Sequence, residues 1–591
     1  MKAICLLTVL LIPSLVVVSE ETKNDDDCTI YLAPSTIEGA GLGIFTSIPL
    51  ASNTVIGVSD VIVPIIDLRD HHPGAFFWLL SDYVWDGIQM MGMQRESDPY
   101  DPTDFPPVDA FAPGFDCAIN CHLGILNVDR TLPSYDTNLP HRSKYPSAGS
   151  MTSYWNSSTF TITDVPAGAE LFKFYGDDWF MSRPSNFKDV PLSKDYPEAE
   201  ALLKRTKYLM QERWGLSEKV QRDLYDAIVS LQSPVLNALP RSIDQMDQVL
   251  EKGISSILQP HHLRDNLQDM PEARCMESIV AGQSLIEGAG RGGFAAWSFQ
   301  EGEVITGSPL IHIHEKELLN LFSRENRLIE SSHVVGKQLL MNYCWGHPET
   351  ALLLCPYGSG VNYINHSRKR ANVKIQWAPN GHIGQDDAWF HWSLRRMTSS
   401  FRPNLAWDFI ALRDIAEGEE ILIDYGDEWV DAWEEHVAEW QTADKPSEYA
   451  EYKSAAEWNE LFKEADIRTE EERLENPYPD HIDVVCHTTV KLNTYLQQQK
   501  GEIWDITMDG VPCRVNRRQK DADDETYYTV GVVGDPSGER EKVHRKMLRF
   551  RDQHYSTDMH LEGAFRKEAT IPDDMLPVAW RRNKRRRHDE L

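Results

Sequence analysis

Gly418-Glu419-Glu420-Ile421-Leu422-Ile423-Asp424-Tyr425-Gly426 combines a charged turn with a short apolar run that ends in a tyrosine. Two further stretches precede it in the second half of the chain, and they read Gly288-Ala289-Gly290-Arg291-Gly292-Gly293-Phe294 and Asn362-Tyr363-Ile364-Asn365-His366-Ser367. Short apolar runs between glycine-rich and charged turns are typical of β-strands. We therefore expect a strand-rich unit over residues 271–432.

The first half of the chain repeats these features in a weaker form. Ile37–Gly41 recurs as Ile286–Gly290, and Tyr175-Gly176-Asp177 recurs as Tyr425-Gly426-Asp427. Between these blocks, Asn120 and Asn127 keep the same gap as Asn365 and Asn372. Several blocks in one order at a nearly constant displacement indicate an internal duplication. The first copy spans residues 28–185.

The order of the three motifs in the second copy resembles the SET domain of protein lysine methyltransferases. The resemblance implies an α+β fold with two tandem SET-like, β-rich domains, each with a pseudoknot in which the C-terminal segment passes through a loop. It also implies S-adenosyl-L-methionine as the cofactor and a lysine side chain of a protein as the acceptor. The second copy is the better preserved one.

The resemblance assigns roles to nine residues. The cofactor is expected to contact Gly290, Arg291, Gly292, Gly293, Asn365 and His366. A glycine-rich turn lets a ligand approach the backbone closely, and an asparagine offers both donors and an acceptor. Tyr425 is expected to orient the amine as the catalytic residue, with Tyr357 and Tyr363 as walls of the channel. The alternatives are a simple hairpin turn, an Asn-x-Ser glycosylation acceptor at Asn365, and a packed strand aromatic.

The first copy departs further from the family pattern. Leu42 stands in the place of Arg291, and Cys121 stands in the place of His366. We interpret the first copy as a structural or substrate-docking partner. No cysteine-rich cluster follows Tyr425, which puts a histone-type substrate in doubt.

The remaining segments have simpler patterns. Residues 186–270 are expected to be a helical connector, and residues 433–480 a helical segment whose tryptophans form a packing stripe. Residues 484–580 are expected to form a small β-rich module, although the tail 555–580 suggests no chemistry.

The two ends of the chain predict its location. Residues 1–19 have the charged start and apolar run of a cleavable signal peptide, with a membrane anchor as the alternative. His588–Leu591 form an HDEL signal, which a retrieval receptor reads at a free C-terminus. Together they predict the lumen of the endoplasmic reticulum and no membrane span after cleavage. The basic run Arg581–Arg587 leaves a nuclear protein as the alternative.

The net charge of the chain bears on its binding partners, and its cysteines and histidines bear on disulfides and metal sites. The formal net charge of −32 disfavours direct binding of nucleic acid and suits a basic peptide. Cleavage would leave eight cysteines whose pairing the sequence does not determine. No metal site is expected, because Cys117, Cys121 and His122 are better explained by a disulfide, and His312 and His314 by surface histidines.

These features predict a protein-lysine N-methyltransferase of the secretory pathway that depends on S-adenosyl-L-methionine. Two alternatives stay open: a catalytically inactive SET scaffold that binds polypeptides in the lumen, and a nuclear histone-lysine methyltransferase.

Overall fold

A computed structural model describes the chain from residue 28 to residue 581. It leaves out residues 67–81, 88–107, 137–138, 232, 323–333, 401, 443–451, 464, 480, 492–501, 505–509, 523, 533–538, 553–558, 560 and 562. Both ends of the chain, with the expected signal peptide and HDEL sequence, lie outside the described residues.

The first unit begins with a hairpin of β1 (Ile30–Pro34) and β2 (Leu42–Thr46). A six-stranded sheet follows, in the order β4 (Val84–Asp86), β5 (Val108–Phe111), β3 (Val55–Ile66), β8 (Tyr154–Thr161) and β6 (Val128–Arg130), with β7 (Ser134–Tyr135) also paired to β8. The short helices α4 (Asp177–Met181) and α5 (Pro184–Phe187) close this unit.

The second unit is built on a ten-stranded sheet in the described part of the chain. Its order is β10 (Ile279–Gln283), β11 (Arg291–Ala295), β20 (Glu420–Ile423), β18 (Val373–Trp377), β19 (Ala406–Ala411), β12 (Val304–Ile313), β16 (Leu353–Pro356), β15 (Trp345–Gly346) and β28 (Ala569–Thr570), with β17 (Asn365–His366) paired to β20. Every residue of β19 and β20 is buried, which explains why these strands read as apolar runs without alternation. A separate hairpin joins β13 (Asn320–Phe322) and β14 (Val334–Lys337).

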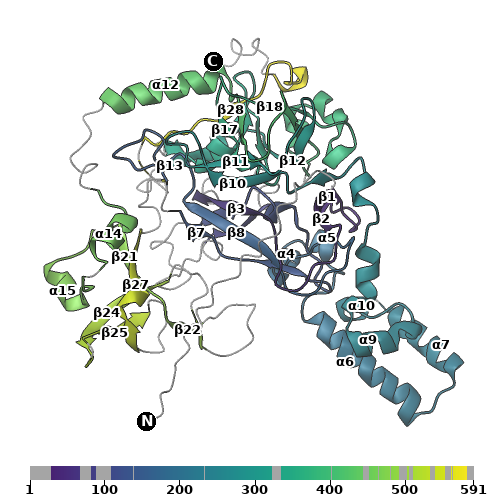
Figure 1. Ribbon diagram of the computed structural model, residues 1–591. Helices are drawn as coiled ribbons and strands as arrows, with labels where there is room; N and C mark the ends of the chain where they lie inside the picture. Colours follow the sequence, from purple (N-terminus) through teal and green to yellow (C-terminus); the bar gives the residue numbers. More distant parts are fainter. Residues whose placement is uncertain are drawn as a thin grey trace, which may run out of the picture.

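The two units lie against each other, and Figure 1 shows β3 and β8 next to β10 and β11. Strand β1 of the first unit pairs with β9 (Arg274–Cys275), which precedes the second unit. A disulfide joins Cys28 to Cys275 at the same place, and one hydrophobic core contains buried residues of both units, from Ile30 to Ala406. The two units therefore form one packed body.

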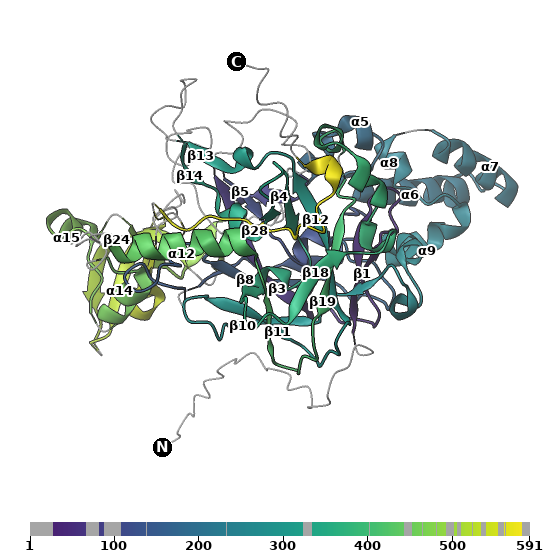
Figure 2. The same cartoon turned by 90° about the horizontal axis from the view of Figure 1, so that it is seen from above.

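The expected connector is helical. It contains α6 (Asp195–Lys207), a π-helical turn η3 (Tyr208–Arg213), α7 (Glu218–Val229), α8 (Pro234–Asn237), α9 (Met246–Lys252) and α10 (Ser255–Leu258). Its helices have a hydrophobic core of their own, and they project from the paired units as a separate lobe (Figures 1 and 2).

After the second unit, helix α12 (Asp427–Thr442) runs along its surface (Figure 2). Helices α14 (Ala455–Leu461) and α15 (Glu470–Glu475) each begin at a capping box, Ser454 with Glu457 and Thr469 with Glu472. They accompany a five-stranded sheet in the order β26 (Glu539–His544), β25 (Thr526–Val532), β24 (Val511–Lys520), β21 (Ile482–Cys486) and β27 (Leu548–Asp552). A separate hairpin pairs β22 (Thr489–Lys491) with β23 (Glu502–Trp504).

The described part of the tail 555–580, which the sequence analysis grouped with this module, packs against the second unit instead. Strand β28 pairs in parallel with β15 of the second unit, and Trp580 is buried in the core of that unit. The core of the five-stranded module contains residues from Ala455 to Phe550. The tail could not be placed from its sequence because it has no periodicity and its partners are distant in the chain.

The mixture of β-rich sheets and helices agrees with the α+β class. The tandem duplication and the pseudoknot stay predictions. Among the described residues, no helix has the length and apolar character that a membrane span requires.

Candidate active site

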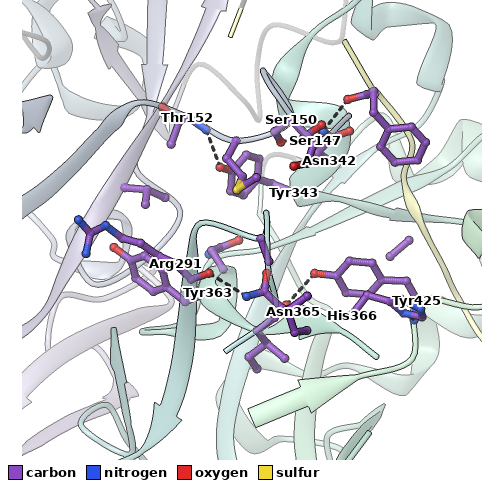
Figure 3. A pocket seen from close by; sticks show the side chains of 18 of the residues that line it. Ser147, Ser150, Thr152, Arg291, Asn342, Tyr343, Tyr363, Asn365, His366 and Tyr425 are labelled. Carbon is purple, nitrogen blue, oxygen red and sulfur yellow. Dashed lines mark hydrogen bonds between the residues drawn. The ribbon is translucent and has the colours of Figure 1, made fainter. Parts of the chain in front are cut away.

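A cavity of about 380 Å³ lies where the second unit meets the first (Figure 3). From the second unit, its walls include the glycine-rich turn, the 361–366 segment, aromatic side chains of β15, β19 and α12, and Tyr425 after β20. From the first unit, they include residues of the segment 136–155, and from the tail they include Phe565 and Ala569. The cavity therefore depends on three separate parts of the chain.

Asn365 links two of the three sequence motifs. The backbone of Asn365, in β17, pairs in parallel with that of Leu422 in β20. The side-chain Nδ2 of Asn365 donates to the carbonyl oxygen of Arg291 at 2.8 Å. Asn365 Oδ1 accepts no hydrogen bond within the described part of the chain, and it belongs to the cavity wall. Asn365 therefore fixes the glycine-rich strand and leaves one acceptor for a ligand.

Tyr425 follows the end of β20 and links to the same segment. Its hydroxyl donates to the carbonyl oxygen of Ile364 at 2.6 Å, and its backbone N–H donates to His366 Nδ1 at 2.9 Å. Burial raises the pKa of the Tyr425 hydroxyl far above its ordinary value. The hydroxyl therefore remains protonated and can donate a hydrogen bond, but it does not serve as a base.

His366 is neutral at ordinary pH, because burial lowers the pKa of its imidazole and outweighs the opposing effect of Asp424. A neutral ring has one unprotonated nitrogen, which the bond from Tyr425 requires at Nδ1. His366 therefore holds Tyr425 in place through the backbone.

Tyr363 and Tyr343 add two hydroxyl groups to the polar part of the cavity wall. The Tyr363 hydroxyl donates to the carbonyl oxygen of Ser59 in the first unit at 2.8 Å. The Tyr343 hydroxyl accepts from the Thr152 N–H at 3.1 Å, and burial raises its pKa to about 12. Both hydroxyls are tied to the first unit, so that unit helps to orient these rings.

The glycine-rich turn is covered by the first unit. Gly288 and Gly290 have φ angles of 75° and 66°, which favour glycine. The Ser147 hydroxyl donates to the carbonyl oxygen of Gly288 at 2.6 Å, and a Cβ at Gly290 would lie 2.7 Å from Met151 Sδ. These glycines therefore allow close packing between the two units, in addition to any contact with a ligand.

Arg291 has a different setting from the expected cofactor contact. Its Nε lies 2.6 Å from Asp136 Oδ2, and the two side chains are only 15% and 3% exposed. Its guanidinium carbon lies 3.0 Å from the centroid of the Trp155 ring. The side chain thus binds the first unit, while its carbonyl oxygen accepts from Asn365.

Of the other residues expected at the site, Gly292 and Gly293 lie next to it and Tyr357 lies away from it. Gly292 and Gly293 lie in β11, where Gly293 pairs with Ile421 of β20 and a side chain on it would approach the Tyr363 backbone. Tyr357 does not join Tyr425 and Tyr363. It lines a separate cavity in the first unit, where its ring lies 5.2 Å from that of Tyr83.

The sequence analysis missed several aromatic residues of the wall. Trp429 lies 5.1 Å from Tyr425 and 5.4 Å from Phe565, measured between ring centroids. Trp433 stacks on Trp429 at 5.8 Å. Trp433 was visible as part of a helical stripe, but the stripe did not include Trp429 and does not show that its packing partner is a cavity.

Two minor expectations were wrong. Cys117 and Cys121 are free cysteines, whereas the disulfides of the described residues are Cys28–Cys275 and Cys344–Cys355. His312 is buried rather than on the surface, and its Nε2 lies 3.2 Å from the carbonyl oxygen of Met397. Within the described part of the chain, no group of three or more acidic, histidine or cysteine residues is arranged to hold a metal ion.

Residues 290–426 match the family model described as SET domain. The resemblance inferred from the motifs of the second unit is therefore confirmed for this segment. No curated protein matches the chain.

Solved structures also resemble part of the chain. A candidate histone methyltransferase of Plasmodium falciparum is 20% identical over 26% of this chain and 96% of its own, with a TM-score of 0.17. A Chaetomium thermophilum Polycomb Repressive Complex 2 structure with S-adenosylmethionine bound is 24% identical, over 25% of this chain and 15% of its own, with a TM-score of 0.17. The match thus spans less than a sixth of that complex's matched chain.

Proposed function

We propose that the chain is a protein-lysine N-methyltransferase of the secretory pathway and that the second unit carries its active site. The observation that supports this most directly is the position of the Tyr425 hydroxyl. It is fixed on the Ile364 carbonyl oxygen, beside the Asn365–His366 strand and inside a cavity rich in aromatic side chains. This arrangement can position an amine but offers no nucleophile, which suits a transfer reaction that depends on orientation.

S-adenosyl-L-methionine, the methyl donor of SET-domain methyltransferases, would supply an electrophilic methyl group on a sulfonium. The residues present fit this cofactor. Asn365 Oδ1 is a free acceptor for an ammonium group, and Gly288 and Ala289 of the glycine-rich turn line the cavity. Cavities of about 300–1,000 Å³ are typical of small-molecule sites, and this cavity falls in that range.

The protein side of the reaction is the preparation of the amine. A lysine ammonium must lose a proton before its nitrogen can accept a methyl group, and its ordinary pKa is about 10.4. Burial among Tyr343, Tyr425 and Trp429 disfavours the charged form, so the pKa of a bound lysine should fall. The tyrosine hydroxyls remain protonated, so the proton leaves to water rather than to Tyr425 or Tyr343.

Electrostatics favour a cationic substrate. The net charge of −32 attracts basic segments of other proteins. Within the cavity, Arg291 is neutralised by Asp136, while Glu287 has no cationic partner among the described side chains. The cavity should therefore favour a cation.

An inactive scaffold is the second candidate, and one observation favours it. Ser147 and Met151 of the first unit already occupy positions against Gly288 and Gly290. If this segment cannot move, it would restrict the space available to a cofactor at the turn.

Calorimetric titration with S-adenosyl-L-methionine tests the proposal. We expect binding to the full chain, weakened by about 10-fold or more in Asn365→Ala because the free acceptor is lost. Asn380→Ala, an exposed asparagine outside the cavity, is the matched control. Absence of binding to the unsubstituted chain would favour the scaffold.

The proposed location has its own test. A tag inserted after residue 19 should report a lumenal protein, and deletion of His588–Leu591 should cause its secretion. A cytosolic or nuclear protein would contradict the secretory proposal and leave the site chemistry unaffected.

A further inference from the structure

The first unit contains a second cavity, of about 780 Å³, whose place corresponds to that of the first. It is lined by the glycine-rich turn 37–42 and by Asn120, Cys121, Tyr175 and Trp179. These are the positions that match residues 286–291, Asn365, His366, Tyr425 and Trp429 in the sequence repeat. The SET-domain match at residues 290–426 includes none of these first-unit residues, although Tyr357 and Arg402 of the matched segment also line the cavity.

The hydrogen bonds that frame the two cavities are the same. Asn120 Nδ2 donates to the Leu42 carbonyl oxygen at 2.8 Å, as Asn365 does to that of Arg291. The Tyr175 hydroxyl donates to the Ile119 carbonyl oxygen at 2.6 Å, as that of Tyr425 does to Ile364.

A third bond is shared as well. Ser35 Oγ donates to Glu170 Oε1 at 2.6 Å, and Ser284 Oγ donates to Glu420 Oε1 at the same distance. The substitutions in the first unit have thus left the polar frame of its cavity intact.

Two groups in this cavity suit a zwitterionic amino-acid tail. Asn120 Oδ1 accepts no hydrogen bond from a described residue, so it can accept one from an ammonium group. Arg402 reaches over the turn from the second unit, with its Nη2 2.9 Å from where a Cβ of Gly39 would lie. No described carboxylate pairs with this guanidinium, which is therefore free to bind a ligand carboxylate.

The rest of the wall suits a flat ring. Tyr175 lies 5.2 Å from Trp179, and Tyr83 lies 5.2 Å from Tyr357, between ring centroids. Aromatic faces of this kind stack on heteroaromatic bases. An amino-acid tail joined to a base describes an adenosyl amino acid.

The charge of the cavity wall distinguishes the two forms of an adenosyl amino acid, the cationic sulfonium and the neutral thioether. Asp82 is paired with Arg183 at 2.7 Å, and Arg402 offsets Glu38, which corresponds to Glu287 of the other cavity. The second unit has no counterpart of Arg402 in its cavity wall. The charges of this wall therefore balance, so it offers a sulfonium no net attraction and leaves a neutral thioether acceptable.

We propose that the cavity of the first unit is a second adenosyl site, which binds S-adenosyl-L-homocysteine, the demethylated product of the reaction, and transfers nothing. This inference rests on the proposed function for the identity of the product. Tyr357 and Arg402 of the second unit form part of this site, so both units contribute to its wall.

Calorimetric titration of the full chain with S-adenosyl-L-homocysteine tests the inference. We expect two molecules per chain in the unsubstituted protein. Arg402→Ala should weaken one site by about 10-fold or more, since a charge-assisted hydrogen bond is lost, and Asn365→Ala should weaken the other. Arg395→Ala, an exposed arginine of the same segment outside both cavities, should change neither.

A photoreactive 8-azidoadenosyl analogue of the thioether locates the sites directly. Mass spectrometry should find labelled peptides that contain Trp179, and excess S-adenosyl-L-homocysteine should prevent the labelling. One molecule per chain with no label near Trp179 would overturn the inference and leave the proposed function standing. A single site that Arg402→Ala weakens and Asn365→Ala does not would support the inference and count against the catalytic assignment of the second unit. Labelling near Trp179 by an azido-substituted aromatic amino acid, but not by the adenosyl probe, would also overturn it.

Discussion

The ion pair between Asp136 and Arg291 should hold the catalytic turn in place from the first unit. Asp136→Ala removes the carboxylate and leaves the guanidinium without its partner in a site where Arg291 is only 15% exposed. Removing one partner of a buried pair costs about 3–5 kcal/mol. Because the Arg291 guanidinium also stacks on Trp155 and keeps part of that contact, we expect the lower end, about 3 kcal/mol, as the loss in free energy of unfolding.

Urea-induced unfolding of four proteins measures this effect: the unsubstituted chain, Asp136→Ala, Arg291→Met and the double variant. In the Arg291→Met background no guanidinium is left unpaired, so Asp136→Ala should cost much less there. The difference is the coupling energy, which we expect to be about 2 kcal/mol for a charge-assisted hydrogen bond.

Asp244→Ala is the matched control, since Asp244 pairs with Arg222 at 2.9 Å on the surface of the helical lobe. An exposed pair of this kind contributes little because solvent screens it. If Asp136→Ala and Asp244→Ala have the same small effect, or if the cycle is additive, the first unit does not hold the turn in this way.

Two further predictions concern the tyrosines and a buried carboxyl. Tyr425→Phe should lower methyl transfer by about 100-fold, because orientation is lost, while Tyr175→Phe should leave it nearly unchanged; equal losses in a radiolabelled transfer assay would contradict the assignment of the second unit as catalytic. Burial, with a smaller contribution from Asp116, raises the pKa of Asp60 from 3.8 to about 7, so the folded state favours the neutral carboxyl. The stabilisation from this group is present at acidic pH and is lost as pH rises through about 7. Asp60→Asn removes the titrating group, so it should flatten the dependence of melting temperature on pH between pH 3.8 and about 7. A variant with the same pH profile as the unsubstituted chain would contradict this prediction.

The core of the site could be predicted because it is made from local motifs. Asn365 and Tyr425 belong to short stretches whose hydrogen bonds follow from strand pairing. The parallel pairing of β17 with β20 brings the second and third motifs together, and the Asn365 amide brings in the first. Each of these contacts between motifs depends only on residues of the motifs themselves and on one pair of strands.

The covering of the site could not be predicted, because it arises from packing between distant segments. Asp136 and Met151 contact the glycine-rich turn only because the two units face each other. Phe565 comes from a tail without periodicity. Tyr357 follows the end of β16, and the sequence does not show that its side chain enters the cavity of the first unit.

The two Asn-x-Ser acceptors of the chain test location and site together. The first, Asn156-Ser157-Ser158, lies on β8, where Asn156 is exposed and has a φ of 62°. A glycan there would extend into solvent. Asn365 is different, because a glycan on its Nδ2 would remove the bond to Arg291 and fill the cavity.

Passage through the lumen should therefore leave a glycan on Asn156 and none on Asn365. Glycosidase treatment should reduce the mass of the purified chain, Asn156→Gln should abolish that change, and glycopeptide mapping should find Asn365 unmodified. A chain without any glycan at Asn156 would count against the lumenal location and would not affect the chemistry of the site. A glycan on Asn365 in most molecules would contradict the catalytic proposal itself, since no cofactor could then share the cavity with it.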